Sequence, residues 1–365
     1  MAEAQFGRST QTDSGSTRHA RLPFQFFGSG SEYFGIWIVN VLLTVLTIGI
    51  YSAWAKVRNK RYFNGQTELD GFRFDYHARP VQILKGRIIV IVVLIVMAIL
   101  NQLHPILAVA VLVFYAVALP WVIIRGLRFN ANMTSYRNLR FHFEDTKWRA
   151  FKANILWPFL ATLSLGLLMP FASRANVRFL GNGHRFGQSR FSADPKLKPF
   201  YQALGVAMAI LIAATALAAL GAYTTFSRVT LIDPNNTDPA AFLAFLFQAV
   251  VFVPFYLAFF VASAAYAALA RNAAFNVLAL EGGHEFRSTV SVGSYCWIIV
   301  TNLILTIATI GLFIPWAKVR IARYLADNTT MLAKGDLDRF VEDQTDDRGV
   351  ASGEFLDIEG IDFGF

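Results

Sequence analysis

The chain has 365 residues, of which 55% are hydrophobic and 16% are charged, and its formal net charge is +9. Soluble domains carry about a quarter charged residues, so this composition excludes an ordinary soluble enzyme and predicts a membrane protein with several hydrophobic helices. The single cysteine, Cys296, has no second cysteine to pair with inside the chain, which excludes a disulfide-stabilised secreted scaffold.

Residues 1–22 are rich in Ser, Thr, Gln and Gly and contain no long apolar run. We therefore expect a disordered N-terminal segment and no cleavable signal peptide there. Two short pieces further on, Phe24-Gln25-Phe26 and Phe141-His142-Phe143, alternate with the two-residue period of small strands.

Six uncharged runs dominate the rest of the chain, over residues 33–55, 88–124, 153–173, 199–227, 239–270 and 288–317. A spanning helix needs about 20 apolar residues, and the second run is long enough for two helices. The sequence therefore predicts an all-α polytopic membrane protein with seven hydrophobic helices, of which four to seven span, and with short strand-like cytoplasmic segments.

The first and last apolar runs overlay without a gap when one is shifted by 262 residues. The shift places Asn40 on Asn302 and the run 54–58 (Trp-Ala-Lys-Val-Arg) on the identical run 316–320. A third, weaker copy lies between them, and such self-similarity indicates an internal repeat. The predicted organisation is a disordered segment over 1–22, a repeated membrane domain over 23–326 with copies near 23–124, 125–270 and 271–326, and an acidic tail over 327–365.

The repeated motif carries a family resemblance. The pattern over residues 47–58 (TIGIYSAWAKVR), with its second copy over 315–320 (PWAKVR), resembles the YjgN family, and the acidic ending over 353–358 is similar to that family's ending. The resemblance covers roughly residues 22–365 and implies a bacterial inner-membrane protein with a domain of unknown function. It implies no substrate, cofactor or catalytic residue, and the third copy departs from the pattern with Ser173-Arg174 in place of Lys56-Val57.

The charges are unevenly distributed along the chain. Residues 327–365 hold eleven acidic and three basic residues, whereas the other Lys and Arg lie mostly in loops between apolar runs. If all seven helices span, 22 Lys and Arg share the side of the C-terminus and 11 lie opposite; if the three repeated segments do not cross, the split is 32 to 1. Charge therefore favours four spans with a cytoplasmic C-terminus, while the length of the apolar runs favours seven.

A polar stripe follows one face of the first apolar helix and recurs in the last. Polar groups in hydrocarbon need partners, so we expect this face to contact protein or water. Two interpretations stay open: hydrogen bonds between helices, which we favour, or the lining of a solute path between repeats. The stripe consists of Asn40, Thr44, Thr47, Asn302, Thr306 and Thr309.

A second face combines tryptophan with basic residues after each of these helices. Trp settles at the level of lipid headgroups and Arg pairs with phosphate, so membrane anchoring is the simpler interpretation and a specific anionic-ligand site is the sharper one. The candidate lipid- or anion-binding residues are Trp54, Lys56, Arg58, Arg61, Trp316, Lys318, Arg320 and Arg323.

The residue pattern shows no grouped acid, base and nucleophile, and no metal-ligand or cofactor motif. We therefore expect a non-enzymatic transporter- or channel-like module for a small or anionic solute, without cofactor, metal or nucleic acid and in contact with membrane lipid. The alternative is an envelope-associated membrane scaffold that binds lipid and protein partners. The sequence leaves its protein partners unidentified.

Overall fold

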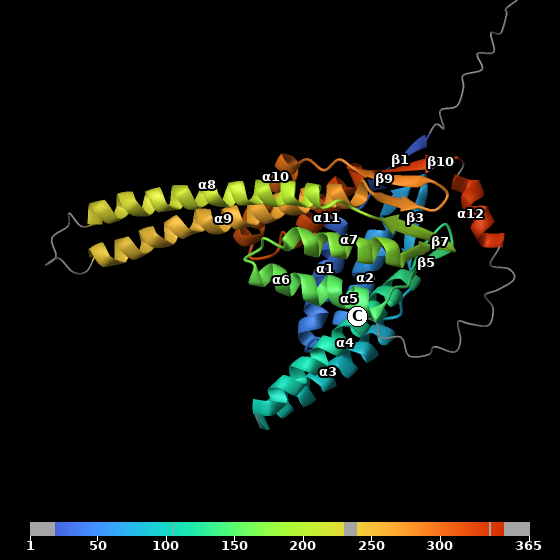
Figure 1. Ribbon diagram of the computed structural model, residues 1–365, viewed down its shortest axis with the longest axis horizontal. Helices are drawn as coiled ribbons and strands as arrows, with labels where there is room; N and C mark the ends of the chain where they lie inside the picture. The colour runs from blue at the N-terminus through green and yellow to red at the C-terminus, as the bar shows by residue number, and fades with distance from the viewer. Residues whose placement is uncertain (1–18, 104, 230–238, 336, 347–365) are drawn as a thin grey trace, which may run out of the picture.

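The computed structural model describes residues 19–103, 105–229, 239–335 and 337–346. Within these residues, ten antiparallel strands close into a barrel from which all the helices but one project (Figure 1). The strands are β1 (His19–Phe26), β2 (Thr67–Leu69), β3 (Phe72–Tyr76), β4 (Thr134–Tyr136), β5 (Leu139–Phe143), β6 (His184–Phe186), β7 (Ser189–Ala193), β8 (Leu278–Leu280), β9 (His284–Ser288) and β10 (Thr329–Lys334).

The barrel shows that the prediction of an all-α fold was wrong. The two strand-like pieces identified in the sequence do lie in β1 and β5, but they belong to one closed sheet rather than to isolated segments. Each hairpin is a strand of three residues followed by one of five, and long helices separate one hairpin from the next. A run of three residues is too short to show a period, so closure of the sheet left no clear trace in the hydrophobic pattern.

Tight turns make these short hairpins. Asp70 and Gly71, with φ of +51° and +76°, join β2 to β3, and Arg137 and Asn138, with φ of +50° and +65°, join β4 to β5. Two successive residues with positive φ match the right-handed twist of the flanking strands, which is why Asp-Gly favours such a turn. The first and last strands, β1 and β10, pair with each other and close the barrel.

Aromatic and aliphatic side chains fill the barrel interior. Five of the six longer strands, all except β10, each supply a phenylalanine that lies in register with a buried residue of the neighbouring strand. The interior of an eight-stranded barrel is just wide enough for side chains to fill. A ten-stranded barrel encloses more space, so large residues are needed here. The pairs are Phe24 with Leu69, Phe74 with Tyr136, Phe141 with Phe186, Phe191 with Leu280, and Phe286 with Met331.

A short helix covers the end of the barrel away from the other helices (Figure 1). This helix, α12 (Leu337–Asp346), packs Leu337, Phe340 and Val341 against the barrel core. Asp338 on α12 forms an ion pair with Arg137 in the β4–β5 turn. The end of the barrel is therefore closed by apolar packing and held by a charge pair.

Five helical excursions leave the barrel between strands. Backbone hydrogen bonds tie the start of an excursion to its return, as from Phe27 N to Gln66 O and from Glu144 N to Gly183 O, so the chain leaves and re-enters at the same end. The helices are α1 (Gly30–Leu46), α2 (Ser52–Gly65), α3 (Pro80–Leu103), α4 (Pro105–Asn132), α5 (Lys147–Phe151), the π-helical η1 (Lys152–Leu156), α6 (Trp157–Leu163), α7 (Met169–Gly183), α8 (Leu197–Val229), α9 (Pro239–Phe275), α10 (Val292–Ala308) and α11 (Ile314–Asp327).

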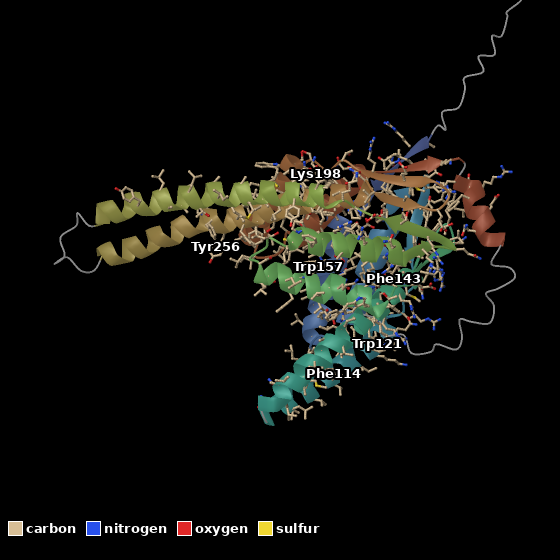
Figure 2. All side chains as sticks on the ribbon, in the orientation of Figure 1. Phe114, Trp121, Phe143, Trp157, Lys198 and Tyr256 are labelled. Carbon is tan, nitrogen blue, oxygen red and sulfur yellow. The ribbon has the colours of Figure 1, made fainter. Side chains whose placement is uncertain are left out.

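Two of these excursions are long hairpins, formed by α3 with α4 and by α8 with α9. In the described part of the chain, four helical segments are long and apolar enough to cross a membrane: Pro80–Gln102, Leu107–Asn132, Leu197–Gly221 and Pro254–Phe275. Figure 2 shows nitrogen atoms gathered around the barrel, while the labelled Phe114 and Tyr256 lie further out along the long hairpins. The structure thus supports a membrane protein with four spans, at the lower end of the predicted range.

The other three excursions are short hairpins: α1 with α2, α5–η1–α6 with α7, and α10 with α11. A 17-residue helix such as α1 or α10 extends only about 25 Å, less than the hydrocarbon core of about 30 Å. Each short hairpin also returns to the barrel through a basic helix, so the chain ends on the side of the membrane from which it left. A single crossing of the membrane by the outgoing helix does not fit this path.

The tips of the short hairpins share one turn. Ile48, Leu165 and Ile310 adopt φ of +50° to +52°, and each is followed by a glycine with φ near +90°. These three apolar side chains are 94%, 93% and 95% exposed. A branched residue in the left-handed region is strained, so each tip combines an unfavourable backbone conformation with an exposed apolar side chain.

The predicted domain limits need two amendments. Residues 1–18 of the predicted disordered segment lie outside the described residues, and residues 19–22 form the start of β1 rather than a disordered piece. The predicted acidic tail begins with β10 and α12, which pack into and against the barrel, and its residues 347–365 lie outside the described residues.

Candidate functional site

The predicted polar stripe on α1 makes contacts within its own short hairpin. Asn40 is buried and donates a hydrogen bond from Nδ2 to Oδ1 of Asn59 on α2, 3.1 Å away. Thr44 donates to the carbonyl of Asn40, and the hydroxyl of Thr47 accepts from the backbone N–H of Tyr51 in the turn. These contacts give the amide N–H of Asn40 and the two threonine hydroxyls partners within the protein, while Oδ1 of Asn40 is buried without a hydrogen-bond partner among the described residues. They favour helix packing over a solute path.

The matching stripe on α10 behaves similarly. Oδ1 of the buried Asn302 accepts a hydrogen bond from Nη1 of Arg320 on α11, 3.3 Å away. Thr309 accepts from the backbone N–H of Phe313 in the turn, and Thr306 contributes its backbone carbonyl to the same turn. The two asparagines therefore join the outgoing and return helices of their hairpins.

Two of the predicted anion-binding arginines donate hydrogen bonds to backbone carbonyls at the points where the chain leaves the barrel. Arg61 on α2 donates from Nε to the carbonyl of Tyr76 and from Nη2 to that of Ala78, at 3.3 and 3.5 Å. Arg323 on α11 donates from Nη2 to the carbonyl of Gly28, at 2.7 Å. Their charge-assisted hydrogen bonds anchor the return helices to the segments that follow the longer strands.

The tryptophans pack within the helical layer. Trp54 stacks on Tyr51, with ring centroids 6.0 Å apart, and Trp316 lies 5.0 Å from the ring of Phe34 on α1. Trp316 also lies so close to Gly30 that no Cβ would fit there. The predicted residues Arg58 and Lys318 remain exposed on α2 and α11.

Lys56 belongs to a cationic cluster with Lys60 and Arg87. Burial, and after it the positive charge of Lys56, lower the pKa of Lys60 to about 8. Burial and then the charge of Arg87 lower the pKa of Lys56. Nζ of Lys60 donates to Oδ1 of Asn130, and no carboxylate within the described residues forms an ion pair with these three cations.

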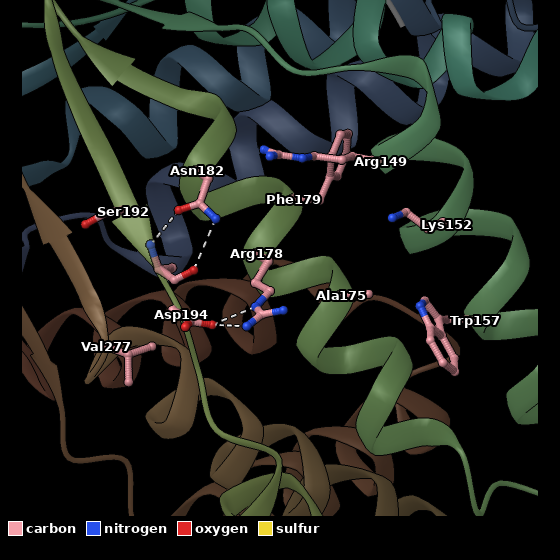
Figure 3. Close-up of a pocket in the computed structure, with 11 residues that line it drawn as sticks. Arg149, Lys152, Trp157, Ala175, Arg178, Phe179, Asn182, Ser192, Asp194 and Val277 are labelled. Carbon is pink, nitrogen blue, oxygen red and sulfur yellow. Dashed lines mark hydrogen bonds and ion pairs between the residues drawn. The ribbon is translucent and has the colours of Figure 1, made fainter.

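One site that sequence reasoning missed is a cavity of about 660 Å³ beside the middle short hairpin. Figure 3 shows that its lining side chains come from two sides: Arg149, Lys152 and Trp157 from α5, η1 and α6, and Arg178 and Asn182 from α7, with Ser192 and Asp194 at the end of β7. We call it the basic cavity, because three cations and one carboxylate line it.

Hydrogen bonds fix one wall of the basic cavity. Nε of Arg178 donates to Oδ1 of Asp194 at 2.7 Å, so one cation and the carboxylate neutralise each other (Figure 3). The side chain of Asn182 donates to the carbonyl of Ala193 and accepts from its N–H, which fixes α7 on β7. On the opposite wall Arg149 forms an ion pair with Asp145, so Lys152 leaves that wall positively charged.

Lys152, which lines the cavity, is the first residue of the π-helical segment η1. In η1 the backbone hydrogen bonds skip one residue further than in an α-helix, which rotates the side chains that follow. Such segments occur frequently at functional sites. A possible signal in the sequence was the basic run Lys147, Arg149 and Lys152, together with the departure of the third copy from the motif at Ser173-Arg174.

Comparison with known proteins places this fold in a family. The "Inner membrane protein YjgN" of Salmonella typhimurium (strain LT2) is 26% identical over 352 residues, which is 86% of this chain and 88% of that protein. Proteins of the same description from Escherichia coli O157:H7 and Escherichia coli K12 are 31% and 34% identical over 144 and 149 residues, in each case 39% of this chain and 36% of the relative.

No solved structure matches the chain. The family model described as "Bacterial protein of unknown function (DUF898)" matches residues 21–358, which include the whole barrel apart from its first two residues and all the membrane hairpins. These matches confirm the resemblance drawn from the repeated motif. The chain therefore belongs to the DUF898 family of bacterial proteins, and the curated relatives it matches are named inner membrane proteins.

Proposed function

We propose that this protein is a non-enzymatic inner-membrane module that binds a small anionic solute in the basic cavity. The observation that carries the proposal is the placement of Lys152, beside the Arg149–Asp145 ion pair, across from the Arg178–Asp194 pair in a cavity of about 660 Å³. That volume falls in the range of about 300–1,000 Å³ typical of ligand pockets. The excess of positive charge favours a phosphate or carboxylate group.

This proposal narrows the transporter- or channel-like function that the sequence predicts. The polar stripe and Arg61 and Arg323 bond to their own protein, so they supply less support for a solute path than the basic cavity does. Movement of the solute across the membrane would then depend on the spanning hairpins next to the cavity. The proposed ligands are the solute and membrane lipid, with no cofactor.

We further propose that the barrel and the C-terminus lie in the cytoplasm. Four spans with the barrel on one side place 32 of the 33 Lys and Arg on that side or in the barrel-side ends of the spans, as the positive-inside rule favours. A reporter fused near Lys198, or after β10, should report cytoplasm, whereas a periplasmic signal at either place would contradict this orientation.

The shared turn at residues 48–49, 165–166 and 310–311 supports an internal repeat. We propose that the three short hairpins are copies of one unit and that the middle copy gained the binding role. The π-helical segment and the basic cavity both belong to that middle copy.

Thermal stability of the purified protein tests the proposed binding. A ligand that binds only the folded state stabilises it by about 2.7 kcal/mol at one hundred times its Kd, so titration with phosphate, sulfate, succinate and citrate should raise the Tm for at least one of them. Sodium chloride at matched ionic strength is the control for screening.

Two matched variants locate the effect. Lys152→Gln should remove most of the ligand-induced rise in Tm, while Lys147→Gln, which removes the same charge from an exposed position on α5, should retain it. If none of the four anions exceeds chloride, or if both variants respond as the wild type does, the anion-binding proposal is wrong. The membrane scaffold predicted as the alternative would then be the better interpretation.

A further inference from the structure

The barrel interior contains unfilled apolar space. A cavity of about 200 Å³ lies among the five phenylalanines of the longer strands and extends to Leu337 of α12. No polar side chain other than that of Tyr136 lines it within the described residues, and the hydroxyl of Tyr136 is bonded to the carbonyl of Leu69. The space is therefore unsuited to water or to an ion.

A second apolar cavity adjoins the first at the membrane end of the barrel. It measures about 290 Å³ and lies between α7 and the end of α9. Four residues line both cavities: Phe141, Phe191, Phe275 and Leu278. The two spaces are therefore neighbours that share an apolar wall, and they lie one after the other between the helical layer and the barrel interior; we call this pair of spaces the apolar route.

The rim of this route carries no charge. Among the described residues that line the outer cavity, His184 is the one with a polar side chain. Its Nδ1 lies 2.7 Å from the carbonyl of Leu180, to which it donates, and burial lowers the pKa of the ring. A neutral, bonded imidazole at the mouth leaves the route open to an apolar group.

We propose that the barrel binds one hydrocarbon chain of a membrane amphiphile, which enters between α7 and α9. An apolar cavity of this size stays dry, and its lining loses dispersion contacts while it is empty. Together the two cavities reach the volume of an ordinary ligand pocket. The mouth lies beside α9, a candidate membrane span, so the bilayer is the nearest source of such a chain.

This site is distinct from the basic cavity. Ala175, Arg178 and Asn182 of α7 face the basic cavity, whereas Val177 and Leu180 lie on the opposite face of the same helix and line the apolar mouth. The hydrocarbon-binding proposal therefore does not depend on the proposed anion binding, and each can fail without the other.

Photochemical labelling tests the proposal on the full-length protein in bilayer nanodiscs. Two probes carry a diazirine in mid-chain: palmitic acid and a phosphatidylethanolamine with one modified acyl chain. Labelled peptides are then identified by mass spectrometry. We expect label on β7 and β9 next to Phe191 and Phe286, in addition to label on the lipid-facing helices. The two arms show whether a free fatty acid or a phospholipid supplies the chain.

A pair of variants separates the barrel from the surrounding lipid. Leu278→Trp fills the junction of the two cavities and should reduce labelling of β7 and β9 by about tenfold, which corresponds to an affinity difference of about that factor. Ala279→Trp, at the next residue of β8 on the outer face, should leave it unchanged. Labelling of the long hairpins shows that each variant is inserted and folded.

Wild-type labelling confined to the lipid-facing helices with both probes would overturn the proposal, even if Leu278→Trp failed to fold. Equal labelling of β7 and β9 in the two variants would also overturn it. Labelling of these strands by either probe, with loss in Leu278→Trp alone, would support it.

Discussion

Arg323 donates a hydrogen bond from Nη2 to the carbonyl of Gly28, 295 residues earlier in the chain. The contact joins α11, the last return helix, to the segment between β1 and α1. Arg61 and Arg128 make the same kind of contact within their own units, to the carbonyls of Tyr76 and Phe143. Arg323 is therefore the member of this set that connects the two ends of the fold.

The Arg323 contact predicts a modest but specific loss of stability. Hydrogen bonds to charged groups contribute about 1.5–3 kcal/mol, and partial exposure of the arginine reduces this, so Arg323→Ala should destabilise the protein by about 1 kcal/mol. Urea unfolding in detergent micelles measures the change. Arg21→Ala, at an exposed position of β1, is the matched control and should change stability by less than about 0.5 kcal/mol. Equal effects of the two variants would contradict the assigned role.

The hairpin tips predict a position-dependent effect of alanine. Gly49 has φ of +87°, and no atom lies within 4 Å of the place where a Cβ would stand. The penalty for Gly49→Ala is thus conformational, about 1–2 kcal/mol. Gly65 near the end of α2 also has open space but no positive φ, so Gly65→Ala should be neutral or stabilising. Thermal unfolding of the two variants compares them directly, and a destabilised Gly65→Ala with an unaffected Gly49→Ala would refute the explanation.

Burial of Lys60 predicts a stability that depends on pH. The folded pKa is about 8, against an ordinary value of 10.5, so between these values the unfolded chain retains a proton that the folded protein has released. Stability from this group therefore rises as pH increases from about 8 to 10.5. Below pH 7 Lys60 is charged in both states, and its burial disfavours the fold.

Lys60→Met checks this sign. The stability of the variant relative to wild type should be greatest near pH 7 and should decline steadily as pH approaches 10, measured from urea midpoints at each pH. Lys147→Met, at an exposed lysine, should show a difference that does not change with pH. A constant difference for Lys60→Met would show that its pKa is not depressed.

The buried asparagine of α10 predicts a structural rather than a binding defect. Asn302→Leu removes the acceptor of one Arg320 hydrogen bond and the donor to the carbonyl of Ala317, so it should destabilise the protein by about 1–3 kcal/mol. Thr306→Val, one turn further along α10, should have a much smaller effect. Anion-induced rises in Tm should persist in both variants, and their loss in Asn302→Leu alone would return the polar stripe to the list of ligand-binding candidates.

The long hairpins were the part of the fold most accessible from sequence. The uncharged runs over 88–124, which residues 101–105 break in the middle, 199–227 and 239–270 correspond to α3, α4, α8 and α9, because a membrane span must be about 20 apolar residues long. The barrel was missed because each strand pairs with a neighbour from another hairpin, often fifty or more residues away, and a three-residue strand such as Thr67–Leu69 shows no period. One signal was available in the sequence: a charged residue directly precedes each of the phenylalanines at positions 74, 141, 191 and 286.

The candidate sites were harder to predict than the spans. Four candidate residues stood out because they form two pairs separated by the same shift along the chain: Asn40 with Asn302, and Arg61 with Arg323. Such recurrence favours residues that stabilise the shared hairpin structure. The basic cavity lies in the middle short hairpin, whose sequence departs from the motif at Ser173-Arg174 and whose π-helical segment begins at Lys152. Repetition therefore identified the structural framework, and the departure from it marked the candidate binding site.

The pairing of β1 with β10 constrains how the protein is made. Strand β1 is synthesised before the other nine strands, yet its partner β10 ends at Lys334, so the sheet stays open until β10 and both long hairpins have been synthesised. Until then β1 and the strand next to the gap present unpaired edges, which invite pairing with other chains. Completion of the C-terminal strand is thus the step that ends this vulnerable period, and a chain that stops before residue 329 is expected to aggregate or be degraded.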